Sequence, residues 1–179
     1  SLRSRNLLLT DSHDLEAMLL QSPALERVIS EYLPGDELHR ADAIALRVRE
    51  ALLVVGVPVG YLRWVAFREQ VGLNVNSVRV DAFVDLPELR VDLGRLIGLV
   101  KKDTKGLVLS AAELRRKVDD LSRRQADPWH IVQGHDLIEI VEVVLPLTVE
   151  EALGPKVAER VRRKARNEKI DEDLRLAYR

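Results

Sequence analysis

The sequence predicts an α/β or mainly α domain, in which one short strand is followed by a series of helices. Residues 5–10 contain an apolar run, Leu7 to Leu9, that is followed by a cluster of turn-forming residues, which is typical of a buried strand. Most of the remaining chain spaces its apolar residues as amphipathic helices do. With 179 residues and 46% apolar content, the chain is long enough to build a core.

Composition excludes several classes of protein. There is no cysteine, so disulfides, thiolate catalysis and cysteine-based zinc sites are excluded. The formal net charge is −1, which argues against a generally basic nucleic-acid-binding coat. The longest apolar stretch, residues 51–59, is too short to cross a bilayer. We therefore expect a soluble protein without membrane contact, and a bacterial cytoplasm as its location.

The first helices are expected directly after the strand. Leu15, Met18 and Leu19 have helical spacing, and Ser22 with Pro23 restarts a helix that Pro34 and Gly35 end. A second helical block covers residues 36–70. We expect Gly56, Val57 and Pro58 to divide it into two helices or to kink it sharply, because proline removes a backbone donor and clashes with the preceding turn.

In this second block the spacing assigns some side chains to the core and some to water. Apolar positions expected to face inward are Ile44, Leu46, Val48, Leu52 and Leu53. Arg63 and Arg68 are expected to lie around a packed aromatic face made by Trp64 and Phe67.

The second half of the chain is predicted to be helical after an irregular stretch at residues 73–91, where short extended pieces lie near 78–80 and 89–91. Capping residues mark most helix starts, the clearest being Ser110 with Glu113 three positions later. The expected helices are 92–102, 111–125, one from Asp127 and Pro128, 136–145 closed by Pro146, 148–167 bent at Gly154 and Pro155, and 170–178.

A lone strand at residues 5–10 needs neighbours, because its backbone groups cannot be satisfied alone. Either a hairpin from residues 73–91 pairs with it, or its partners lie outside this chain. We expect residues 1–34 to be the end of an α/β domain and residues 35–179 to form a mainly helical domain.

The first candidate site is the acidic cluster after the predicted strand, with Asp11, Asp14 and Glu16 as metal ligands and His13 as an accessory group. Polar groups collect at the carboxyl ends of strands in α/β sheets, and clustered carboxylates bind hard cations such as Mg²⁺. Helix capping is the alternative explanation for Asp11 and Asp14.

The second candidate site is His135 with Asp136, where the His-Asp-Leu sequence of the first site occurs again. Asp136 can cap the apolar helix that follows, while His135 could bind a metal or move a proton. A buried histidine bonded to a backbone carbonyl is the alternative. A helical metal phosphohydrolase, with His39 and His130 as further ligands, is another hypothesis that these residue types allow.

A third candidate is the basic stretch Arg160, Arg162, Arg163, Lys164 and Arg166, which could bind nucleic-acid phosphates. Such runs are more often solvated helix faces.

Two segments, "LLLTDSHDLEAMLLQSPAL" and, far downstream, "QGHDLIEI", resemble the Toprim-like proteins related to the overcoming-lysogenization-defect nucleases. Some proteins of that family accompany ATPases in PARIS-type anti-phage systems. The resemblance implies a Mg²⁺-dependent nuclease effector, with an ATPase partner and a homo-oligomeric state. It also implies that Asp11, Asp14 and Glu16 form an accessory acidic motif, since the family's main metal ligands are a glutamate and an Asp-x-Asp pair before the strand.

Two main hypotheses therefore remain open, beside the metal phosphohydrolase. The chain is the C-terminal part of such a nuclease, whose helical region supports the active site, oligomerises or docks on the ATPase; or it is an interaction module without chemistry.

The resemblance predicts that this chain alone does not cleave DNA or RNA when Mg²⁺ is added. The family's glutamate and Asp-x-Asp pair come before the strand, whereas the Asp-x-Asp of this sequence, Asp171 to Asp173, lies in its C-terminal tail. Incubation of the purified chain with plasmid DNA and with RNA tests this. Magnesium-dependent cleavage that co-purifies with the chain would contradict the prediction.

Overall fold

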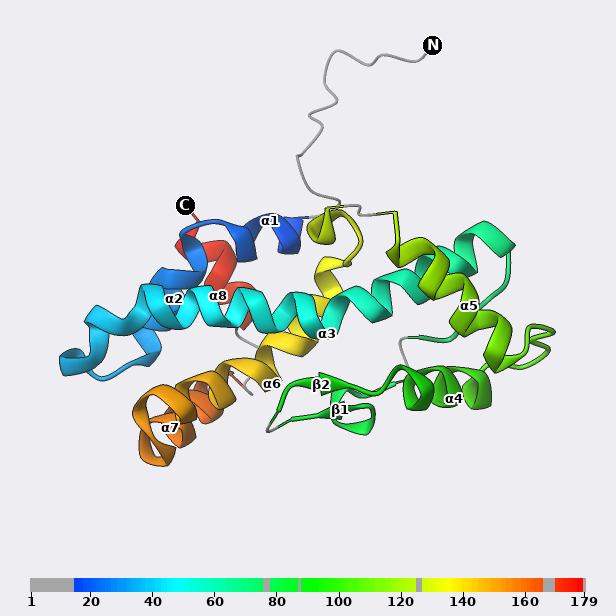
Figure 1. Cartoon of the computed structure of the whole chain (residues 1–179). Helices are drawn as coiled ribbons and strands as arrows, with labels where there is room; N and C mark the ends of the chain where they lie inside the picture. The colour runs from blue at the N-terminus through cyan, green and yellow to red at the C-terminus, as the bar shows by residue number, and fades with distance from the viewer. Residues whose placement is uncertain (1–14, 76–77, 87, 125–126, 166–169, 179) are drawn as a thin grey trace, which may run out of the picture.

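The chain folds around one long helix, α3 (Ala41–Glu69), which runs across the molecule (Figure 1). The computed structural model describes residues 15–75, 78–86, 88–124, 127–165 and 170–178. Within these ranges there are seven further α-helices: α1 (Leu15–Gln21), α2 (Ala24–Tyr32), α4 (Leu93–Asp103), α5 (Ala111–Ser122), α6 (Gly134–Leu153), α7 (Pro155–Ala165) and α8 (Ile170–Ala177).

The mainly helical class is thus confirmed, and the described strands are very small. β1 (Val84–Asp85) and β2 (Arg90–Val91) pair antiparallel, with Val84 opposite Val91. The short extended pieces lie at these positions, not at 78–80, because residues 80–82 form a 3₁₀ turn. The strand predicted at residues 5–10 lies outside the described residues.

Proline does not interrupt the long helices. Pro58 lies inside α3 and Pro146 lies inside α6, so the predicted division at residues 56–58 and the predicted end at Pro146 are both wrong. A proline inside a helix costs about 3 kcal/mol. Burial of several apolar side chains around it outweighs that cost, and Val55, Val59 and Leu62 are buried here.

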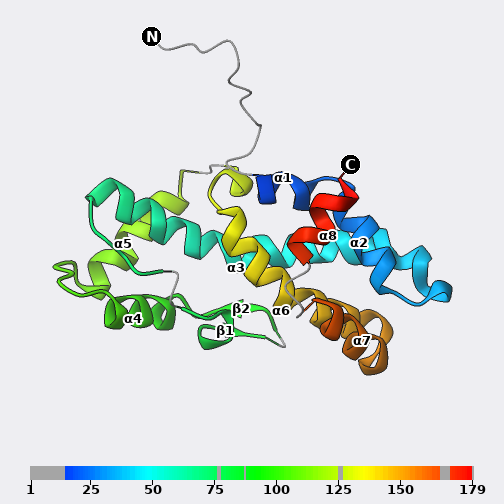
Figure 2. The same ribbon diagram turned by 180° about the vertical axis from the view of Figure 1, so that it is seen from behind.

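α6 crosses α3 closely because two glycines lie on the contact side of α3. The view from behind shows α6 passing in front of α3 (Figure 2). A Cβ on Gly56 would lie 3.1 Å from side-chain carbons of Val132 and Leu137, and a Cβ on Gly60 would lie 2.2 Å from the carbonyl oxygen of Ile131. Glycines four positions apart lie on the same side of a helix, so together they let the two backbones approach.

Arg49 of α3 fixes the corner between α1 and α2. Its guanidinium donates hydrogen bonds to the carbonyl oxygens of Leu20 and Ser22 at 2.7 and 2.8 Å, and to both carboxylate oxygens of Glu26 at 2.6 and 2.8 Å. Burial raises the pKa of Glu26, but its hydrogen bonds and the charge of Arg49 together hold that pKa below its ordinary value. Both ends of the corner are therefore tied to α3.

Local capping signals were predicted well. The Ser110–Glu113 capping box at the start of α5 is confirmed, and Asp92 caps α4 through the amide of Arg95. Asp127 caps only a 3₁₀ turn, residues 128–130, and not the α-helix expected there. α1 and α2 share the hydrophobic core with the later helices. The domain boundary expected at residue 34 stays a prediction.

We predict that Gly60→Ala lowers the free energy of unfolding by about 2 kcal/mol or more, because the added methyl group overlaps the carbonyl of Ile131 and pushes α6 away. Gly98→Ala in α4 is the matched control, since a Cβ there meets nothing within 4 Å. It should leave stability unchanged or raise it by up to about 1 kcal/mol. Urea unfolding followed by circular dichroism measures both, and equal effects would contradict the close crossing.

Candidate functional site

The second candidate site, His135 and Asp136, lies at the start of α6, where Asp136 forms an ion pair with Arg63 of α3. Arg63 donates from Nε to Oδ2 at 2.8 Å and from Nη2 to Oδ1 at 2.6 Å, so the pairing is bidentate. Both side chains are largely buried. His135 is half-exposed, with Nε2 at 3.6 Å from Oδ1 of Asp136. The aspartate therefore neutralises a buried arginine and links α3 to α6.

The expectation that Arg63 lies around a packed aromatic face is wrong. Arg63 reaches Asp136, 73 positions along the chain, and the neighbouring Phe67 is exposed. The sequence around Arg63 does not predict an ion pair with a residue so far along the chain.

Glu16 is the one acidic residue of the first cluster that the structure describes. It lies in the first turn of α1, and its Oε1 is 2.5 Å from Nη2 of Arg175 in α8. Arg175 also forms an ion pair with Asp171. Asp11, His13 and Asp14 lie outside the described residues. The carboxylate predicted to bind a metal thus links α1 to α8.

In the described part of the chain, no group of three histidine, aspartate or glutamate side chains could hold a metal ion. His39 lies in a 3₁₀ turn, with Nδ1 3.1 Å from the carbonyl oxygen of Asp36. His130 lies in a second such turn, at residues 128–130. The ligands of the phosphohydrolase hypothesis are not brought together.

The basic stretch in α7 divides into two groups. Arg162 forms ion pairs with Glu150 and Glu159, and Lys164 donates to the carbonyl oxygen of Glu31 at 2.6 Å. Arg160 and Arg163 are exposed. Arg166 lies outside the described residues. Of the four predicted phosphate-binding residues that the structure describes, two are thus exposed.

Lys164 also borders Tyr32 of α2, at 5.2 Å from the ring centre. The Tyr32 hydroxyl donates to Asp173 of α8 at 2.6 Å. Burial, and then this hydrogen bond to a carboxylate, raise the pKa of Tyr32 well above its usual value, so the phenol stays protonated. The cluster ties α2, α7 and α8 together and presents no nucleophile.

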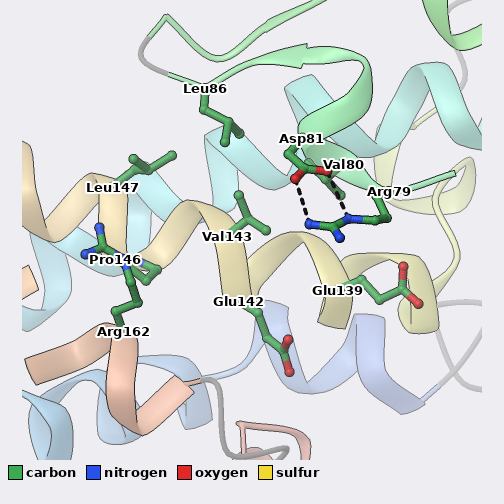
Figure 3. A pocket seen from close by; sticks show the side chains of 10 residues that line it. All are labelled: Arg79, Val80, Asp81, Leu86, Glu139, Glu142, Val143, Pro146, Leu147 and Arg162. Carbon is green, nitrogen blue, oxygen red and sulfur yellow. Dashed lines mark hydrogen bonds and ion pairs between the residues drawn. The ribbon is translucent and has the colours of Figure 1, made fainter. Parts of the chain in front are cut away.

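A groove of about 420 Å³ lies between the segment around Arg79 and helices α6 and α7 (Figure 3). Its lining combines apolar residues, among them Leu86, Val143 and Leu147, with five charged residues. Arg79, on its rim, forms a bidentate pair with Asp81, drawn as dashed lines in Figure 3. Glu139 and Glu142 extend from α6 away from that pair. The groove has no convergent set of polar groups that could orient a substrate.

The outer face of α3 carries apolar side chains in water. Leu46 is 58% exposed, Val54 51%, Trp64 39% and Phe67 85%. Glu50 and Arg68 are exposed on the same side of the helix. We call these six residues the outer face of α3. The prediction that Leu46 faces inward is wrong, and so is the prediction that Trp64 and Phe67 form a packed face.

Comparison with protein-family models, with curated proteins and with solved structures gives no match. Function therefore has to be argued from the chain's own geometry. Among the helices that the structure describes, none combines the length and apolar character that a membrane crossing requires.

We predict that Asp136→Ala lowers the free energy of unfolding by about 3–5 kcal/mol, because it leaves the buried guanidinium of Arg63 without a counter-charge. Arg63→Met combined with Asp136→Leu should cost less than the single change, since both charges are then removed.

The control is Glu151→Ala, which removes an exposed ion pair with Arg47 and should cost less than about 1 kcal/mol. Chemical unfolding of the four proteins makes the comparison. An Asp136→Ala variant as stable as Glu151→Ala would show that the pair does not support the fold.

Proposed function

We propose that the helical region of this chain is a non-catalytic interaction module, whose contact surface includes the outer face of α3. The proposal rests on how the chain uses its polar residues. The acidic groups that could do chemistry, Glu16 and Asp136, are bound to arginines of other helices. They contribute to the fold, and no described cluster is left to bind a metal.

The apolar residues of the outer face support the same proposal. Four large apolar side chains on one side of one helix are more than a scatter of single exposed residues. Each costs free energy while it is in water, and none is needed to fill the core. Residues that do not stabilise the fold and are costly in water are expected where another protein covers them.

The resemblance to Toprim-related nucleases implies a role for this module within a larger protein. It would be the part of a nuclease effector that oligomerises or docks on an ATPase, while Mg²⁺ binds elsewhere in the parent protein. Nuclease activity, the Mg²⁺ site at Asp11 and Asp14, contact with nucleic acid and the ATPase partner stay predictions.

Replacement of Val54 and Phe67 by serine tests whether the outer face serves contact or folding. Because these side chains are 51% and 85% exposed, we expect the double variant to change the free energy of unfolding by less than about 1 kcal/mol. Val55→Ser, one position away and fully buried, should cost about 2 kcal/mol or more. A large loss in the outer-face variant would make those residues structural.

Titration with Mn²⁺ tests the non-catalytic half of the proposal. Calorimetry on the purified chain should show no stoichiometric site that Glu16→Gln or Asp136→Asn abolishes. A saturable site that depends on either carboxylate, together with metal-dependent phosphodiester cleavage, would overturn the proposal.

A further inference from the structure

This inference rests on the proposed function and names the partner. Two charged residues lie at opposite ends of the outer face. Glu50 and Arg68 are both exposed, and neither has an ion-pair partner among the residues that the structure describes. They are 18 positions apart, which is five turns at 3.6 residues per turn, so they lie on the same side of α3, about 27 Å apart. The two side chains therefore cannot form an ion pair within one chain.

We propose that two copies of this chain associate through their α3 helices, antiparallel and around a two-fold axis, with Glu50 of one copy beside Arg68 of the other. An antiparallel pair around a two-fold axis makes every contact twice. Glu50 of each copy therefore pairs with Arg68 of the other copy, and this ion pair forms once at each end of the contact.

The same register also matches side-chain volumes. When Glu50 is opposite Arg68, Val54 of one copy is opposite Trp64 of the other, which places a small side chain against a large one at two equivalent positions. Val57, nearer the axis, is opposite Tyr61. Tyr61 is already buried in its own chain, so the contact depends mainly on its two ends.

Other arrangements of two α3 helices are less favourable. A parallel pair would place Glu50 against Glu50 and Arg68 against Arg68, and like charges across a contact are repulsive. An antiparallel pair shifted by one turn would place Glu50 against Trp64, leaving the carboxylate covered by an indole without a counter-charge. Charge and volume together select one register.

A second copy fits this surface better than an unrelated partner, because the surface complements itself. α2, α5 and α6 pack against α3, yet the six side chains of the outer face stay exposed. A contact about 27 Å long between two helices of this kind resembles a short antiparallel coiled coil.

Cysteine cross-linking tests the register directly, because the natural chain has no cysteine. We expect Val54→Cys and Trp64→Cys proteins, mixed under mild oxidation, to give a disulfide-linked dimer containing one of each. Neither alone should cross-link, since like positions in this register are about 15 Å apart along the helix. Val108→Cys, on a residue 93% exposed outside the helices, replaces either partner as the control and should stay monomeric.

Charge reversal supplies an independent readout by sedimentation equilibrium. Glu50→Arg and Arg68→Glu should each weaken self-association by at least about tenfold, and a chain carrying both changes should recover the affinity of the natural protein. Recovery cannot come from contacts within one chain, because the two residues are about 27 Å apart there. Circular dichroism confirms that each variant is folded.

A chain that stays monomeric at about 1 mM would overturn the dimer, as would a disulfide formed by Val54→Cys alone. Neither result affects the proposal of a non-catalytic module, which only a carboxylate-dependent metal site or a structural role for Val54 and Phe67 overturns. The two proposals therefore fail separately.

Discussion

The close crossing of α3 and α6 is the contact on which the rest of the structure depends. It exists because Gly60 has no side chain at the point where the carbonyl of Ile131 meets α3. That approach brings the start of α6 beside the second half of α3, and so places Asp136 within reach of Arg63. The far end of α6 then carries α7, and α1, α2 and α8 pack around the same pair of helices. A side chain at Gly60 would displace all of these contacts together.

Several ion pairs in this chain join helices that are distant in sequence. Arg63 meets Asp136, Arg49 meets Glu26, and Arg175 meets Glu16, each pair linking two helices. Since a bidentate or partly buried pair restricts the geometry of both helices, these contacts fix how the helices are oriented. Glu16 and Asp136, which suggest a metal site by residue type alone, are in this fold bound to arginines of other helices.

Local signals in the sequence were sufficient for most helix starts, whereas contacts between distant segments were not predictable. The Ser110–Glu113 box lies within four residues, so its hydrogen bonds can be foreseen from spacing. Pro58 was misjudged because its cost is local while the burial that offsets it comes from other helices. Periodicity marked Leu46 as apolar, but spacing cannot say whether a partner covers a face. The Arg63–Asp136 pair depends on a crossing that only the fold creates.

An apolar outer face on α3 follows from what a long central helix has to do. A helix that is apolar on one side lies on the surface of a domain, and a helix that is apolar on both sides has to be covered on both. α6 covers the inner side of α3, where Val55 and Val59 are buried, while Val54 and Trp64 still face water. The charges at the ends of that uncovered side have opposite signs, and each lacks a counter-charge in the described part of its own chain. A second α3, turned end to end, removes both deficits at once, because it brings Val54 against Trp64 at two equivalent positions and the missing charge to each end.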